Sequence, residues 1–182
     1  TGSRIIRTRK EFVKKLSKIA GEVHRKITNG AENLSLKYAC SFNIENCESI
    51  GEIEKAFEKA LEEAYTKELT RCTTLVGPQR DDCEILLNGM SIKLYGSQGQ
   101  QRSAVLSMKL SEIEIMKEDT GEYPVLLLDD VMSELDVNRQ EYLFESIKGN
   151  QTFITCTEKD FFEERVPLEK SKFFRVYNGK IQ

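Results

Sequence analysis

Two adjacent acids, Asp129 and Asp130, directly follow the apolar run at residues 125–128. Side chains alternate along a strand, so these carboxylates would point in different directions into one crevice at the strand's carboxyl end. One carboxylate can hold a magnesium ion through water while its neighbour orients or deprotonates an attacking water. Phosphoryl transfer needs both a bound metal ion and a positioned nucleophile. An acid pair that caps the next helix is the alternative, and the apolar run ahead of the pair favours the phosphoryl-transfer interpretation.

A second candidate is the polar turn Gly96-Ser97-Gln98-Gly99-Gln100, which precedes an apolar helical run. Backbone N–H groups at a helix start lack partners and lie at the positive end of the helix dipole, so they bind phosphate oxygens well. The two glycines would let a phosphate approach the backbone, while the serine offers a hydroxyl and the last glutamine an amide. A serine-capped helix after a glycine turn is the alternative, and the turn by itself does not decide between them.

Lysine and arginine are concentrated near the start of the chain, although the net charge of the whole chain is −3. Residues 1–26 hold nine of these cations against two acids, Glu11 and Glu22. A basic N-terminal segment joined to an otherwise acidic chain is typical of a protein that contacts nucleic acid. The solvated face of an amphipathic helix is the alternative.

The remaining composition argues against several other kinds of site. The five cysteines are odd in number, scattered and never spaced as C-x-x-C, so neither a disulfide framework nor a zinc knuckle is indicated. His24 is the only histidine, and its helical setting favours a surface or packing role. No apolar run approaches a membrane span and no secretion signal is recognisable, so we expect a cytoplasmic protein.

Three elements are expected before residue 75. Apolar residues recur at helical spacing over residues 12–27, and Asn29-Gly30 suits a left-handed cap, which predicts a first helix. Alternation over residues 34–42 predicts a half-buried strand. Ser49 and Glu52 have the spacing of a capping box, which predicts a long charged helix to about Arg71, of a kind that suits an arm or lid.

From residue 75 onward, the order of predicted strands and helices is typical of an α/β fold. Asn88-Gly89 between the apolar runs 83–87 and 90–95 predicts a hairpin, and Asn178-Gly179 predicts another at the end. A helix is expected from about Gln100 to Lys117. Residues 123–130 and 151–157 read as strands buried on both faces, with a helix over residues 137–148 between them, which predicts a right-handed β-α-β unit.

The order of these features resembles the ABC-type ATPases, which carry a signature motif (here residues 96–100), a helix, a Walker B strand (125–130) and a D-loop (133–136). Within that superfamily the chain is similar to the branch of SMC and Rad-type DNA-repair ATPases. The segments GPQRDD, YGSQGQQR and LLLDDVMSELD, with SRIIRTRKEFVKKL ahead of them, resemble the RecF family of recombination mediators. The combination is much more specific than either motif alone.

This resemblance implies an α/β fold that forms the C-terminal half of an ABC-type P-loop ATPase, a parallel β-sheet core with flanking helices plus a largely helical arm lobe. We expect the arm lobe, with one strand, at residues 1–73 and the ATPase lobe at residues 74–182. The Walker A pattern Gly-x-x-x-x-Gly-Lys followed by Ser or Thr occurs nowhere, since the only Gly-Lys is Gly179-Lys180. ATP and Mg²⁺ are therefore expected as cofactors of a full-length, weakly active ATPase, and this chain alone should bind neither tightly and should be inactive.

The resemblance also implies roles for individual residues, because ABC-type ATPases hold two nucleotides between two subunits. Asp129 would hold Mg²⁺ and Asp130 would orient the hydrolytic water. The residues expected to meet the γ-phosphate held by the other subunit are Ser97, Gln98, Gly99 and Gln100, and those expected at the D-loop interface are Ser133 and Asp136. Arg80 is expected near the nucleotide, with an ion pair to Asp81 or Asp82 as the alternative. Two departures from the wider superfamily imply slow hydrolysis. Asp130 replaces the usual Glu, and Thr157 replaces a switch histidine.

RecF-like proteins bind DNA where duplex meets single strand and load recombinase at gaps, so the resemblance implies DNA, RecR, RecO and an ATP-driven homodimer as partners. It favours a DNA-facing arm over a merely solvated helix. The residues assigned to that face are Arg4, Arg7, Arg9, Lys10, Lys14 and Lys18. The alternatives are a non-catalytic interaction domain with a degenerate ATPase half, and a transporter ATPase fragment, which Gln98 in place of glycine disfavours.

Overall fold

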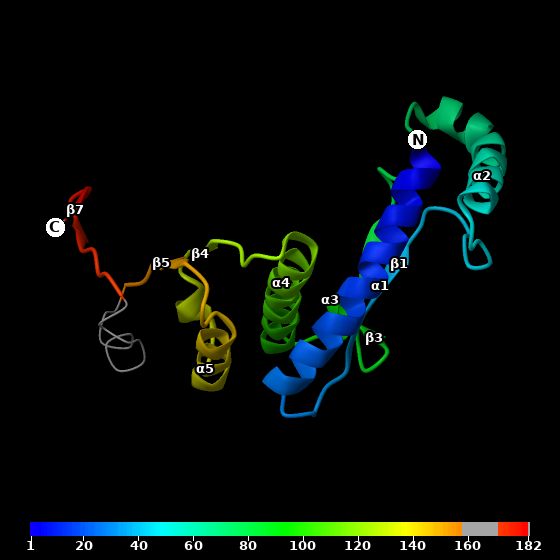
Figure 1. Cartoon of the computed structure of the whole chain (residues 1–182). Coiled ribbons are helices and arrows are strands. Elements are labelled where there is room, and N and C mark those ends of the chain that lie inside the picture. The colour runs from blue at the N-terminus through cyan, green and yellow to red at the C-terminus, as the bar shows by residue number, and fades with distance from the viewer. Residues whose placement is uncertain (158–170, 182) are drawn as a thin grey trace.

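Helix α1, Gly2–Ile27, is the longest element of the computed structural model, which describes residues 1–157 and 171–181. Its apolar face packs Leu16 and Ala20 against the strand β1, Leu34–Ala39. Figure 1 shows β1 running alongside α1. Asn29 and Gly30 both take positive φ after the helix, as a left-handed turn requires. The predicted first helix and first strand are confirmed.

Helix α2, Ile50–Arg71, begins with the predicted capping box, in which the Ser49 hydroxyl oxygen and the Glu52 side chain each accept a backbone N–H of the other residue. Near its start Ile53 is buried, and Phe57 stacks on Phe42 with the ring centroids 5.2 Å apart. Further along α2 Ala64 is buried, but the large apolar side chains of Leu61, Tyr65 and Leu69 are exposed, Leu69 at 61%. Helix α2 lies at the end of the molecule where α1 begins, far from α5 (Figure 1).

A three-stranded antiparallel sheet joins β1 to β2, Asp82–Leu87, and to β3, Met90–Ser91. Asn88 and Gly89 both have positive φ, which confirms the predicted hairpin turn. The expected strand over residues 90–95 is wrong beyond Ser91, because Ile92–Tyr95 form the short helix α3. Ile92 is buried in the core that α1, β1 and β2 share, and the chain can turn back over it only because residue 96 lacks a Cβ, which would lie 2.5 Å from the Ile92 carbonyl oxygen.

Helix α4, Gln98–Thr120, belongs to two cores at once. Ala104 and Ile115 pack into the core of α1 and the antiparallel sheet. Leu106, Leu110 and Ile113 pack on the opposite side against η1 (Val131–Glu134) and α5 (Val137–Ser146). From Ala104 onward, α4 is therefore flanked on both sides.

The strand β4, Leu126–Leu128, precedes α5 in the chain, and β5, Thr152–Ile154, follows it. The two strands pair in parallel, as predicted. The prediction that they are buried on both faces is wrong, since Leu127 is 77% exposed and Phe153 54% exposed. Among the described residues, helices cover only the face that carries Leu126, Leu128 and Ile154. A last hairpin pairs β6, Val176–Tyr177, with β7, Lys180–Ile181, as predicted.

The division at residues 73 and 74 stays a prediction. The structure pairs β1 with β2 across this boundary and packs α1 against α4, so the two predicted parts share a sheet and a core. Among the described residues, no helix combines the length and the apolarity needed to cross a membrane.

Candidate nucleotide and nucleic-acid sites

The signature turn forms a capping box at the start of α4. Ser97 Oγ accepts the backbone N–H of Gln100 at 3.2 Å, and Gln100 Oε1 accepts the backbone N–H of Ser97 at 2.9 Å. Ser97 and Gln98 are exposed, whereas Gly99 and Gln100 are half-buried. The turn is thus a serine-capped helix start, and it also presents the first N–H groups of α4 to solvent as an anion site would.

The two glycines of the turn have different surroundings. The fold of this chain itself requires glycine at residue 96, because a Cβ there would clash with Ile92. A Cβ added at Gly99 would meet nothing within 4 Å. Glycine in a helix interior costs about 1 kcal/mol relative to alanine, and the packing of the described residues does not explain it at residue 99. The space beside Gly99 suits a ligand that approaches the backbone closely.

The side-chain amide of Gln100 reaches beyond the turn, where it donates to Glu32 Oε1 at 2.8 Å. The other carboxylate oxygen, Glu32 Oε2, lies 3.1 Å from Nε2 of His24, whose Nδ1 lies 2.9 Å from Ser107 Oγ. His24 has no exposed surface, so its packing role is observed and a surface role is excluded. Sequence reasoning missed Glu32, because no motif links it to a residue 68 positions away.

The acid pair lies where β4 ends. Asp130 takes a left-handed backbone conformation, with φ 48° and ψ 24°, and it precedes η1 without a side-chain capping bond. The helix-capping alternative for the pair is therefore not what the structure shows. Thr155, which follows β5, donates its hydroxyl to Asp129 Oδ1 and accepts the backbone N–H of Asp130 at 3.0 Å. The sequence drew attention to Thr157, which is exposed, and missed Thr155, which parallel pairing brings to the acids.

The residues present are compatible with Mg²⁺. In the part of the chain that the structure describes, no three His, Cys, Asp or Glu side chains gather into a metal cage. Mg²⁺ in nucleotide sites is held by one or two carboxylates together with waters and substrate phosphates, so it needs no such cage. Asp129 is oriented by one hydrogen bond from Thr155, and an ionised carboxylate has further acceptor positions for magnesium-bound water.

The D-loop is anchored by helix α5. Asp136 caps that helix by accepting the backbone N–H of Arg139 at 3.1 Å, and it forms an ion pair with the Arg139 side chain. Gln140 donates to the carbonyl oxygens of Met132 at 2.8 Å and Leu135 at 3.0 Å. The side chain of Ser133 lies outside the described part of the structure.

Arg80 donates to Thr73 Oγ1 at 2.6 Å. The alternative ion pair with Asp81 or Asp82 is not the arrangement observed, because Asp81 accepts the Tyr38 hydroxyl and the Ser41 backbone N–H. Burial is the main cause, and the hydrogen bond to Asp81 the second, that raises the pKa of the Tyr38 hydroxyl above its ordinary value. A role for Arg80 near a nucleotide stays a prediction.

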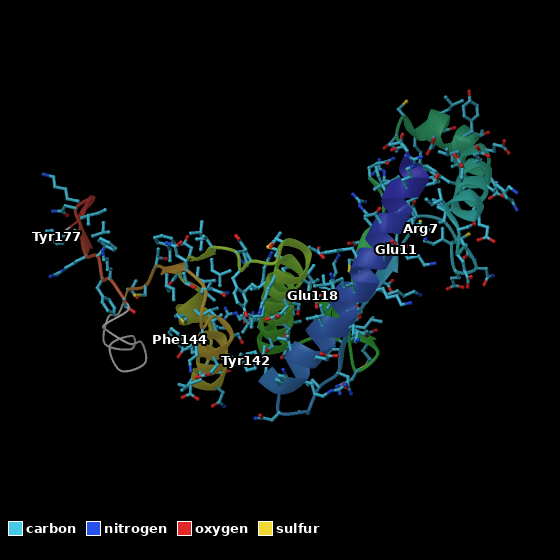
Figure 2. All side chains as sticks on the ribbon, in the orientation of Figure 1. Arg7, Glu11, Glu118, Tyr142, Phe144 and Tyr177 are labelled. Atoms are coloured by element: carbon cyan, nitrogen blue, oxygen red, sulfur yellow. The ribbon has the colours of Figure 1, made fainter. Side chains whose placement is uncertain are left out.

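Several cations of the predicted DNA-facing set make intramolecular contacts. Arg7 pairs with Glu11 at 2.8 Å, as Figure 2 shows on α1. Arg9 donates to the Pro78 carbonyl oxygen at 2.5 Å, and Lys10 donates to the carbonyl oxygens of Ile44 and Cys47. Arg4, Lys14 and Lys18 are exposed.

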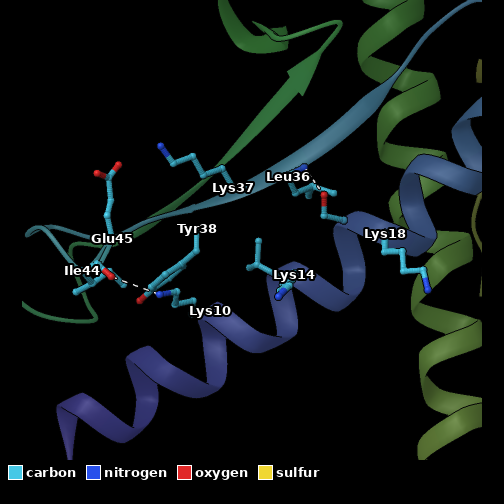
Figure 3. Close-up of a pocket in the computed structure, with 10 residues that line it drawn as sticks. Lys10, Lys14, Lys18, Leu36, Lys37, Tyr38, Ile44 and Glu45 are labelled. Carbon is cyan, nitrogen blue, oxygen red and sulfur yellow. Dashed lines mark hydrogen bonds between the residues drawn. The ribbon is translucent and has the colours of Figure 1, made fainter. Parts of the chain in front are cut away.

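Lys10, Lys14 and Lys18 line a groove of about 500 Å³ between α1 and β1, shown in Figure 3. They are spaced four residues apart, which places them along one side of the helix. Lys37 on β1 faces the same groove and adds a fourth cation, while Glu45 contributes one negative charge. Sequence reasoning missed Lys37, because an exposed strand lysine gives no periodic signal.

Comparison with known proteins places the chain in a family. It is 52% identical over 178 residues to a protein called DNA replication and repair protein RecF from Acetivibrio thermocellus, with 98% of this chain and 48% of that relative covered. Proteins of the same name from Ruminiclostridium cellulolyticum and Clostridium perfringens (strain SM101) are 50% and 46% identical, over 97% and 100% of this chain and 47% and 48% of theirs. No protein-family model matches the chain.

Solved structures agree with the sequence relatives. A structure described as the recombination mediator protein RecF with ATP in the RecFOR pathway has a TM-score of 0.83 and 38% identity, covering 100% of this chain and 46% of its own. A second RecF structure gives a TM-score of 0.82 and 39% identity, over 99% of this chain and 46% of its own. The chain thus spans about half the length of the relatives that it matches. It belongs to the RecF family and corresponds to the C-terminal half of these α/β ABC-type ATPases.

Proposed function

We propose that this chain supplies the signature motif and the Walker B acids of an ATP-dependent DNA clamp in recombinational repair, in which ATP joins two subunits. The observation that carries the proposal is the start of α4, where exposed Ser97 adjoins the open space beside Gly99. A serine-capped helix start with this opening is suited to a γ-phosphate bound by a second subunit.

The geometry of the turn defines what each group offers. Ser97 Oγ already accepts one hydrogen bond from Gln100, so its hydroxyl hydrogen can donate to a phosphate oxygen. The backbone N–H groups of Gln98 and Gly99 are in the first turn of α4, where a helix offers no internal acceptors. These donors also lie at the positive end of the α4 dipole, which stabilises a bound anion.

The acid pair serves hydrolysis. Asp129 would hold Mg²⁺ through water, and the bound ion would neutralise part of the phosphate charge. Asp130 accepts the proton of the attacking water or orients it, and its backbone is held in place through its N–H bond to Thr155. Because an Asp side chain is one methylene shorter than Glu, this water is held less closely, and slow turnover follows.

The two groups belong to different nucleotide sites of a dimer. The strand β4 that precedes the acids packs on the part of α4 that begins at Leu106, whereas Ser97 lies at the start of α4. At 1.5 Å per helical residue, Leu106 lies about 13 Å along the axis from Ser97. In the proposed dimer, a second subunit brings its signature turn opposite each acid pair.

The lysine groove would contact DNA phosphates, so binding should be salt-sensitive and largely independent of sequence. In this proposal the full-length cytoplasmic protein acts with RecO and RecR to load recombinase at gapped DNA. The pathway named for the solved neighbour supports these partners.

The test uses a full-length family member that contains this chain. Ser97→Arg places a bulky cation where the phosphate would sit, so ATP-driven dimerisation should be lost while ATP binding to the monomer persists. Asp130→Asn should retain the ATP-bound dimer and lower kcat by at least about 100-fold, because it removes the group that positions water. Sedimentation velocity with ATP and a phosphate-release assay measure the two effects.

Dimers that still form in the Ser97→Arg variant would contradict a site shared between subunits. Unchanged kcat in the Asp130→Asn variant would remove Asp130 from the reaction but leave the shared site in place.

A further inference from the structure

We propose that Glu32 and His24 are positioning residues that hold Gln100, and through it the signature turn, against the end of helix α1. The inference rests on the proposed function, because it gives the signature turn its role. It adds two residues that lie outside every motif of the sequence.

Glu32 is the central member of this arrangement. One carboxylate oxygen accepts the Gln100 amide at 2.8 Å, and the other lies 3.1 Å from His24 Nε2. The Glu32 side chain is 20% exposed, so these contacts are largely shielded from water. A charged acceptor in a shielded position makes a stronger hydrogen bond than a neutral one.

His24 connects Glu32 to the interface between α1 and α4. Ser107 donates its hydroxyl hydrogen to the Ser103 carbonyl oxygen at 2.7 Å, so its oxygen accepts from His24 Nδ1 at 2.9 Å. His24, Ser103 and Ser107 have no exposed surface. The ring is therefore fixed by packing and by a donor bond, and it faces Glu32 from a rigid position.

The identity of residue 100 fits this role. In the capping box of α2 the equivalent residue is Glu52, an acceptor that bonds the backbone N–H groups of Glu48 and Ser49. Gln100 accepts the Ser97 N–H with its oxygen and donates to Glu32 with its nitrogen. A glutamate at residue 100 has no donor and would place a second carboxylate beside Glu32. Glutamine thus serves the local cap and the tertiary contact together.

The test compares two substitutions of Glu32 in the full-length protein. Glu32→Ala removes the acceptor of the Gln100 amide. Glu32→Gln keeps that acceptor and offers its own amide to His24 Nε2, which accepts when Nδ1 carries the ring proton. Glu22→Ala is the matched control, since Glu22 is an exposed acid on α1.

The Glu32→Ala variant should weaken ATP-driven dimerisation about tenfold, the size of one lost hydrogen bond to a charged group. Hydrogen exchange at the bonded backbone amides of Ser97, Gln100 and Gln101 should speed up by a similar factor, whereas exchange elsewhere in α1 and α4 should not change. Glu32→Gln and Glu22→Ala should match the parent protein in both measurements. Adding Glu32→Ala to Gln100→Ala should cause no further loss, because both substitutions break the same bond.

Exchange at the Ser97, Gln100 and Gln101 amides that stays at the parent rate in Glu32→Ala would overturn the positioning role, whatever Ser97→Arg does to dimerisation. A uniform rise of exchange throughout α1 and α4 would also overturn it, since it would show a general packing role. If Glu32→Ala fails to fold, Gln100→Glu tests the same contact with the capping box kept, and Glu52→Gln is its control.

Discussion

Gly99 and Gly51 occupy the same position in two capping boxes, two residues after Ser97 and Ser49. A Cβ at either glycine would meet nothing within 4 Å. Packing within the chain therefore does not distinguish them. Only the proposed phosphate contact gives Gly99 a need for glycine that Gly51 lacks.

Alanine substitutions separate stability from function at these two residues. Gly99→Ala and Gly51→Ala should each raise the free energy of unfolding by up to about 1 kcal/mol, because alanine favours the helix and restricts the unfolded chain. Gly99→Ala should also weaken ATP-driven dimerisation, whereas Gly51→Ala should leave it unchanged. Urea unfolding and sedimentation with ATP measure both quantities in the full-length protein. Equal dimerisation of the two variants would count against a phosphate beside Gly99.

At the scale of elements, helix α1 serves two surfaces. Near its middle it presents Lys14 and Lys18 to the groove, and near its end it holds His24 against α4. Lys15, one residue from Lys14, turns away and bonds Asp119 and Glu118, and these contacts raise the pKa of its ammonium group. Neighbouring lysines on one helix thus differ in what they can offer a ligand.

That difference predicts how DNA binding responds to salt. Removing Lys14 and Lys18 together, as alanines, should reduce the slope of log K against log salt by about 2, since each lost phosphate contact removes about 0.9. Lys15→Ala should change the slope much less, because its charge is already paired with acids. Fluorescence anisotropy with a gapped duplex over a salt series measures the slopes. A Lys15→Ala effect as large as that of the double substitution would show that the groove is not the DNA contact.

At the scale of the whole molecule, the residues that the structure describes leave one face of the parallel sheet uncovered. Val125, Leu127 and Phe153 are more than half exposed, although strands of this composition are usually covered on both sides. The relatives are about twice as long as this chain, so the rest of a full-length member can supply the cover.

A charge placed on this face should therefore have opposite effects in two contexts. In this chain alone, Leu127→Glu should reduce binding of a hydrophobic dye and leave the unfolding free energy nearly unchanged. In a full-length member it should lower that free energy by at least about 2 kcal/mol, because it would bury an unpaired carboxylate. Leu69→Glu, at an exposed site on α2, should be mild in both. A mild effect of Leu127→Glu in the full-length protein would mean that the face stays open there.

The sequence by itself determined the features that depend on neighbouring residues. The correct predictions are the first helix, expected over residues 12–27 and observed from Gly2, the capping box at Ser49, and the hairpin turns at Asn88-Gly89 and Asn178-Gly179. Apolar periodicity, capping and left-handed turn chemistry each act within a few residues, so a local pattern carries them. The parallel strand pair was also predictable, because strand, helix and strand follow one another directly.

Only the tertiary structure decided which polar groups meet. Glu32 reaches Gln100 across 68 positions and His24 reaches Ser107 across 83, while Thr155 meets Asp129 because two strands end side by side. The helical turn after Ser91 and the uncovered face at Leu127 likewise depend on what packs nearby. A hydrogen-bond partner far along the chain leaves no periodic trace, since its position is set by the packing of α1 on α4 and of β4 on β5.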